Sequence, residues 1–173
     1  MNNLRCLPAA CLVLFILVVF GSGVAQTLDL QKLDALLTQI QAYDWGASRE
    51  PLMQYTDLER AAYQDPAMVK EVEKKLLTLL KSNAPLAAKQ FVCQRLSIIG
   101  SEASASTLGK MLKDEKTADM ARYALERIPG IKITEALQKA LGPSKGLTRI
   151  GLINTLGQRA DAGSAAALIK LLN

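Results

Sequence analysis

Apolar residues recur at helical spacing from Leu28 to the end of the chain, with almost none of the alternation that is typical of strands. Turn-forming residues interrupt this pattern, as at Asp65-Pro66, where an N-cap residue precedes a first-turn proline. Asn83-Ala84-Pro85 reads in the same way, with Asn83 as the expected N-cap. Further breaks are Ser48-Arg49-Glu50-Pro51, Gly100-Ser101, Pro129-Gly130 and Gly142-Pro143. The pattern predicts an all-α chain of about nine helices, each of roughly 9 to 17 residues, joined by short turns.

The second half of the chain repeats itself about every 30 residues. A first series of equivalent apolar positions recurs at this spacing: Leu96, Leu125 and Ile153. A second series recurs in the same way: Leu108, Leu137 and Leu168. Each unit therefore reads as a helix, a turn and a second helix. One such unit cannot bury its own apolar face, so neighbouring units must stack. The repeat predicts an α-solenoid of stacked helical hairpins.

Two stretches of this repeat carry a resemblance to a known family: Met120 to Gly130 (MARYALERIPG) and Ile153 to Arg159 (INTLGQR). They resemble short HEAT-type repeats of the class named for phycobilisome lyases, and they are similar to secreted bacterial HEAT-repeat proteins of unassigned function. The resemblance covers residues 85–173 and implies about three HEAT-like repeats that serve as a scaffold. Residues 26–84 depart from the period and are expected to form an atypical N-terminal helical cap. The lyase activity is not carried over, because the chain offers no residues that would identify a bilin site.

The N-terminal segment, residues 1–25, has the plan of a secretory signal peptide. Arg5 gives it a weak positive start, the stretch from Leu12 to Phe20 is apolar, and the small residues Gly23 and Ala25 precede the expected cleavage site. This plan predicts export, with the periplasm as the destination. The alternative is an uncleaved anchor over residues 6–25 that holds the protein in the inner membrane.

Histidine is absent from the 173 residues, which excludes His-dependent catalytic triads, His general bases and His metal ligands. Beyond the predicted signal peptide only Cys93 remains of the 3 cysteines, so no intramolecular disulfide is expected. Cys93 is predicted to be a small buried hydrophobic residue, with a reactive thiol as the alternative. The sequence holds no haem, phosphate-loop or metal-ligand motif. We therefore expect no cofactor, no metal and no enzymatic activity.

A lysine series is the best candidate binding site. Lys110, Lys139 and Lys170 each follow a leucine of the second series by two residues. The HEAT resemblance implies that second helices line a concave face, where these lysines would form a ladder that attracts an acidic protein partner. The alternative is a solvated helix face. A nucleic-acid partner is not expected, because the formal net charge is only +5 and basic residues do not cluster in runs.

Most of the aromatic residues outside the signal peptide lie in the first third of the chain: Tyr43, Trp45, Tyr55 and Tyr63. They predict a hydrophobic lid over the first repeat, with a ligand-binding lip as the alternative.

The last segment, residues 168–173, reads as an ordinary repeat helix without the polar cap that solenoids usually carry. We expect either that the chain is a fragment of a longer protein or that this end is covered by a partner or a second copy. The function predicted from all of these features is a non-catalytic scaffold for protein–protein interaction in the cell envelope. The alternative is the repeat region of a larger envelope enzyme or redox protein whose catalytic domain lies outside this chain.

Overall fold

The computed structural model describes residues 29–172, which form nine α-helices and one short 3-10 helix and contain no strand. The helices are, in chain order, α1 (Leu30–Gln41), α2 (Glu50–Ala62), α3 (Pro66–Leu80), α4 (Leu86–Ile99), η1 (Glu102–Ser104), α5 (Ala105–Met111), α6 (Glu115–Arg127), α7 (Ile131–Leu141), α8 (Gly146–Arg159) and α9 (Ala162–Ile169). The predicted all-α class is confirmed. The predicted signal peptide and the alternative anchor over residues 6–25 lie outside the described residues.

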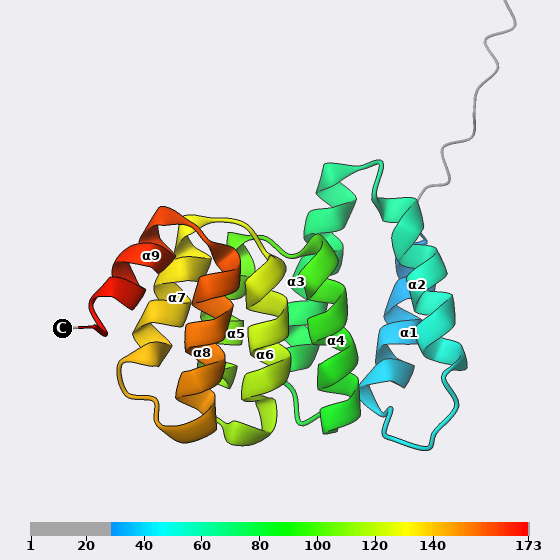
Figure 1. The fold of residues 1–173 in the computed structure, drawn as a ribbon. Helices are drawn as coiled ribbons and strands as arrows, with labels where there is room; N and C mark the ends of the chain where they lie inside the picture. The colour runs from blue at the N-terminus through cyan, green and yellow to red at the C-terminus, as the bar shows by residue number, and fades with distance from the viewer. Residues whose placement is uncertain (1–28, 173) are drawn as a thin grey trace, which may run out of the picture.

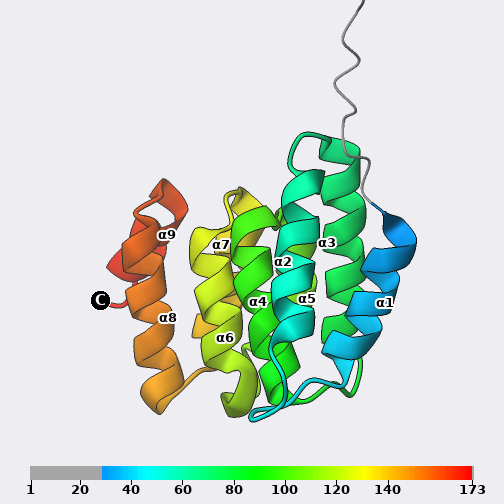
Figure 2. The ribbon, with the colours of Figure 1, turned by 90° about the vertical axis from the view of Figure 1, so that its right-hand side faces the viewer.

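From α4 onward we group the helices in chain order into three helical pairs, α4 with α5, α6 with α7, and α8 with α9; consecutive pairs also touch where α5 packs on α6 and α7 on α8. The first helices of these pairs pack side by side, α4 on α6 and α6 on α8, and the second helices do the same, α5 on α7 and α7 on α9 (Figure 1). At the other end of the molecule α1 and α2 pack on each other, and α3 packs on α4 (Figure 2). From α4 onward the helices therefore lie in two rows, with α4, α6 and α8 in one row and α5, α7 and α9 in the other.

One hydrophobic core runs through the whole of this arrangement, from Leu33 in α1 to Leu156 in α8. Tyr55 of α2 is fully buried in it and makes an edge-to-face contact with Phe91 of α4, with ring centroids 5.6 Å apart. Such aromatic pairs stabilise beyond the area that they bury. The N-terminal helices thus share their core with the helices from α4 onward.

The predicted aromatic lid is wrong for two of its four members. Trp45 is 63% exposed in the turn between α1 and α2, and Tyr63 is 42% exposed just after α2. Tyr43 packs partly against the core. The sequence shows how many aromatic residues gather in this region but not which of them lie on a turn that points away from the core.

Aspartate begins four of the helices as an N-cap whose carboxylate accepts backbone N–H groups: Asp29, Asp65, Asp114 and Asp161. The N-cap expected at Asp65, ahead of Pro66, is confirmed. The similar expectation for Asn83 is wrong, because the N-cap of α4 is Pro85 and carries no side-chain hydrogen bond. Two helices are shorter than expected: α5 has 7 residues, because the separate turn η1 precedes it, and α9 has 8.

In the third predicted repeat, burial favours Leu156 rather than Ile153 as the equivalent of Leu96 and Leu125. Ile153 is only partly buried, whereas Leu156 is fully buried like Leu96 and Leu125. If Ile153 were equivalent to Leu96, Gly157 would be equivalent to Gly100, which follows α4 directly. Instead α8 continues to Arg159, and its C-cap Ala160 takes the left-handed conformation (φ 50°). When Leu156 replaces Ile153, the intervals between successive members of the first series (Leu96, Leu125, Leu156) equal those between successive members of the second series (Leu108, Leu137, Leu168).

Candidate protein-binding site

Two of the three lysines of the predicted series meet at one hollow. Lys110 of α5 and Lys139 of α7 are both exposed and line a hollow of about 710 Å³ between these helices. Lys170, directly after the end of α9, is exposed but does not line this hollow. The structure therefore brings together the first two members of the series and leaves the third outside.

Two further lysines line the same hollow and were missed by the sequence analysis. Lys113 comes from the turn between α5 and α6, and Lys145 from the turn between α7 and α8. Lys113 and Lys145 do not occupy equivalent positions of the predicted repeat, so its spacing does not identify them. We call the hollow with Lys110, Lys113, Lys139 and Lys145 the lysine hollow.

The ammonium groups of the lysine hollow have no acidic partner within the described part of the chain. The ion pairs there involve only two lysines, Lys74 and Lys75, both on α3. One carboxylate, Glu115, lines the hollow beside the four lysines, but it pairs with none of them. An uncompensated group of like charges attracts an anionic partner and is relieved by binding it.

The floor of the lysine hollow is made of small residues. Gly109 of α5 faces Ala136 of α7, where a methyl group built on the glycine would lie 3.4 Å from the alanine Cβ. Ala105 and Ala140 extend this floor. Such short side chains let the two helices approach closely and leave space above them. The site thus combines an apolar floor with a rim of positive charge.

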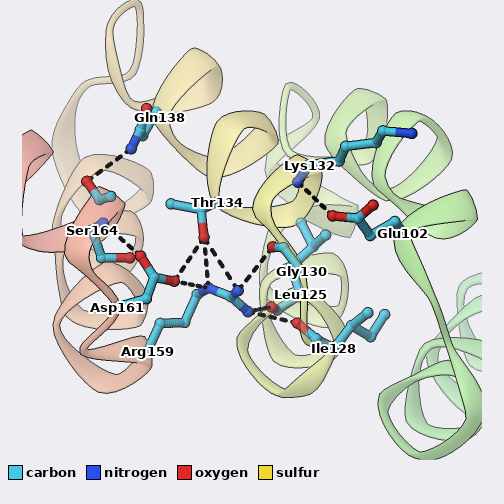
Figure 3. Close-up of polar contacts among 11 residues, drawn as sticks. Glu102, Leu125, Ile128, Gly130, Lys132, Thr134, Gln138, Arg159, Asp161 and Ser164 are labelled. Atoms are coloured by element: carbon cyan, nitrogen blue, oxygen red, sulfur yellow. Dashed lines mark hydrogen bonds and ion pairs between the residues drawn. The ribbon is translucent and has the colours of Figure 1, made fainter.

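Two acidic residues order the starts of the helices that flank the hollow. Glu73 of α3 is 3% exposed and accepts hydrogen bonds from the backbone N–H and the hydroxyl of Ser101 (2.8 Å each) and from the hydroxyl of Ser104 (2.6 Å), which fixes the start of α5. Glu102 accepts the backbone N–H of Lys132 at 3.0 Å in the first turn of α7 (Figure 3). Carboxylates satisfy free N–H groups at helix starts in this way.

Arg159 connects the last two helical pairs. Its side chain is 7% exposed and donates to the backbone carbonyls of Leu125 (2.8 Å) and Ile128 (2.7 Å), where α6 ends (Figure 3). It also donates to Asp161 at 3.2 Å, and Thr134 of α7 donates to the same carboxylate at 2.7 Å. Burial opposes the charge of Asp161, but hydrogen bonds from Ser164 and Thr134 hold the pKa of Asp161 below its ordinary value. The guanidinium thus caps carbonyls that α6 leaves unpaired.

A second buried charge joins α2 to α4. Glu59 is fully buried and forms an ion pair with Arg95, whose Nε lies 2.9 Å from the carboxylate. Tyr55 and Tyr63 donate their hydroxyls to the same carboxylate at 3.3 and 3.1 Å. Burial, together with the Glu59 charge, raises the pKa of both tyrosines, so both remain protonated donors. Every group of this cluster has a partner, and none of them lines the lysine hollow.

Cys93 lies inside the core, with no exposed surface. Burial raises the pKa of its thiol from 9.0 to about 12, so the nucleophilic thiolate is disfavoured at neutral pH. The buried position agrees with the prediction of a small hydrophobic residue and weighs against the alternative of a reactive thiol.

This pKa shift predicts a pH dependence of stability. The unfolded thiol ionises above its ordinary value of 9.0 while the folded thiol keeps its proton until about pH 12, so Cys93 contributes stability that is intact below pH 9 and is lost as pH rises toward 12. Relative to Cys93→Ala, the free energy of unfolding of the native protein should fall by about 1.4 kcal/mol between pH 7 and pH 10. Urea denaturation of both proteins at the two pH values measures this, and a constant difference would contradict it.

Between residues 29 and 172 there is no group of three or more side chains of the types that hold metal ions. No helix in this part of the chain is long and apolar enough to cross a membrane. Comparison of the chain with protein-family models, curated proteins and solved structures finds no match.

Proposed function

We propose that the protein is a non-catalytic scaffold, an α-solenoid of HEAT-like helical hairpins that binds an acidic segment of a protein partner in the lysine hollow. The successive packing of α4, α6 and α8, and of α5, α7 and α9, supports the solenoid. The intervals between successive leucines are the same in the two leucine series, which supports a repeat. Export through residues 1–25 would place this scaffold in the cell envelope.

The observation that carries the proposal is the rim of four lysines without acidic partners around an apolar floor. A partner segment with carboxylates and small side chains fits both parts, because its charges would neutralise the lysines while its small side chains occupy the floor. The hollow is formed by helices that the rest of the fold already holds. Binding therefore needs little ordering of the protein, which favours affinity.

The test is the binding of a fluorescently labelled peptide rich in glutamate and alanine, followed by fluorescence anisotropy on the protein purified from cells that express the full chain. The double substitution Lys110→Glu with Lys139→Glu should weaken binding about tenfold or more, because it replaces attraction by repulsion at the rim. Added salt should weaken binding of the native protein as well, since exposed charges are screened.

The matched control is Lys170→Glu, which changes an exposed lysine outside the lysine hollow and should leave the affinity nearly unchanged. A second control peptide carries glutamine in place of glutamate and should not bind. The proposal is overturned if the peptide binds the double variant, the Lys170 variant and the native protein equally, or if it binds none of them. Competition by inorganic phosphate would show that the hollow accepts free anions besides carboxylate-bearing segments.

A further inference from the structure

The lysine hollow is a groove between two helices that run in the same direction. The chain reverses its direction from α5 to α6 and again from α6 to α7, so α5 and α7 run parallel, and they pack on each other (Figure 1). The lining of the hollow extends from Ala105 to Lys113 on the α5 side and from Ala136 to Ser144 on the α7 side. Each side therefore follows its helix for roughly two turns, or about 12 Å.

Small residues recur along the floor of this groove at the spacing of one helical turn. Ala105 and Gly109 are four residues apart on α5, and Ala136 and Ala140 are four residues apart on α7. Residues four apart lie on one face of a helix, so each pair forms a row along the groove. Because these side chains are short, a third backbone can approach both helices along their axes.

The floor offers no hydrogen-bond partner to an extended segment. Its side chains are those of glycine and alanine, and the backbone groups over the body of α5 and α7 are paired within these helices. An extended segment buried on the floor would leave its own N–H and C=O groups unpaired, which weakens binding. Residues 29–172 also contain no strand with which such a segment could pair. A helical segment satisfies its backbone groups internally and therefore suits this floor.

The positive charge of the hollow is confined to one end of the groove. All four lysines lie at the C-terminal ends of the two helices: Lys110 and Lys139 in the last turns, and Lys113 and Lys145 just beyond them. Glu115, the first residue of α6, lines the same end, where the lysines outnumber it. Ala105 and Ala136 mark the other end, which has no charged lining residue. A segment that follows the groove thus meets lysines at only one of its ends.

We infer that the segment bound in the lysine hollow is an α-helix of the partner, with small residues at every fourth position and carboxylates gathered at one end. This inference rests on the proposed function, because it names the conformation of the segment that the hollow would bind. The small residues of the partner helix face the floor, and its carboxylates meet the lysines. Recognition of an amphipathic helix in a groove is a common mode of binding.

Three alanine-rich peptides of equal length and charge test this inference by fluorescence anisotropy with the native protein. The first carries its glutamates in the first turn, where they stabilise a helix, and a covalent link between two side chains on its outer face holds it helical. The second lacks the link, and the third has, in addition, D-alanine for L-alanine at two central positions, which disfavours the right-handed helix. The first should bind about tenfold more tightly than the second, because it loses less conformational freedom on binding. The third should bind at least tenfold more weakly than the second.

A larger side chain on the floor tests where the helix lies. Ala140→Leu keeps every charge of the hollow and should weaken the binding of the linked peptide about tenfold, because the leucine holds the helix away from the floor. Ala166→Leu is the matched control, since Ala166 is exposed on α9 and does not line the hollow. This variant should bind the linked peptide like the native protein. Far-UV circular dichroism checks that both variants are folded, and the peptide series decides the question if Ala140→Leu is not.

The possible outcomes separate this inference from the proposed function. Equal affinities of the three peptides for the native protein, lost together in the double variant Lys110→Glu with Lys139→Glu, would overturn the helix and leave the proposed function standing. Unchanged binding of the linked peptide by a folded Ala140→Leu variant would also overturn the helix. If none of the three peptides binds the native protein, the proposed function is overturned and the helix with it.

Discussion

Substitution of Arg95 by alanine is expected to lower the free energy of unfolding by about 3–5 kcal/mol, because breaking a buried ion pair leaves an uncompensated charge. The charge in question is Glu59, which is fully buried and has Arg95 as its cationic partner. Tyr55 and Tyr63 would remain as donors, but two neutral hydroxyls do not replace a guanidinium. The loss should be among the largest of any single substitution, since it also loosens the contact between α2 and α4.

Urea denaturation followed by circular dichroism measures this loss, and a double substitution provides the control. Replacing Glu59 and Arg95 together by methionine removes both charges and keeps similar volumes, so part of the stability should return. Recovery should be incomplete, because the two tyrosine hydroxyls lose their acceptor. If the double variant were as unstable as, or less stable than, Arg95→Ala, the buried charge would not be the cause of the loss.

The second large effect is expected at Arg159. Its replacement by alanine should cost about 3 kcal/mol, because the carbonyls of Leu125 and Ile128 lose their side-chain donor and an unsatisfied buried acceptor costs about 1–3 kcal/mol. Asp161 would lose its cationic partner at the same time. The loss of stability should be concentrated at the contacts of α8 and α9 with α6 and α7.

Hydrogen exchange of backbone amides shows which helices are destabilised, and urea denaturation measures the loss in the free energy of unfolding. Amides of α8 and α9 should exchange faster in Arg159→Ala, while those of α1 to α3 should change least. Arg159→Lys should be intermediate, because an ammonium group lacks the planar fork of donors. Arg127→Ala serves as the control: its side chain is 44% exposed, so we expect a loss of less than about 1 kcal/mol. Equal losses for the Arg127 and Arg159 variants would contradict the role of Arg159.

The helical class was predictable from the sequence because it depends on local patterns. The spacing of apolar residues and the turn residues Asp65-Pro66 act over a few neighbours, and the structure follows them. The register of the third repeat was less predictable. Ile153 and Leu156 lie close together on one helix, and only the packing against α6 decides which of them is buried.

The polar contacts between helical pairs could not be predicted in the same way. Arg159 and Glu73 each find their partners on helices that lie far away along the chain, and no local spacing connects such residues. The candidate site was partly predictable for a related reason. Lys110 and Lys139 share a helical position and were found by their spacing, whereas Lys113 and Lys145 reach the same hollow from turns.

The burial of Cys93 provides a chemical probe of how the molecule opens. A thiol reagent cannot reach this side chain in the folded protein, because it lies in the middle of α4 with no exposed surface. Labelling of Cys93 therefore requires that α4 separate from its neighbours α3 and α6. When reclosing is faster than labelling, the labelling rate reports the free energy of that opening. Residues 26–173 contain no other cysteine, so mass spectrometry of this portion would follow a single position without any engineered label.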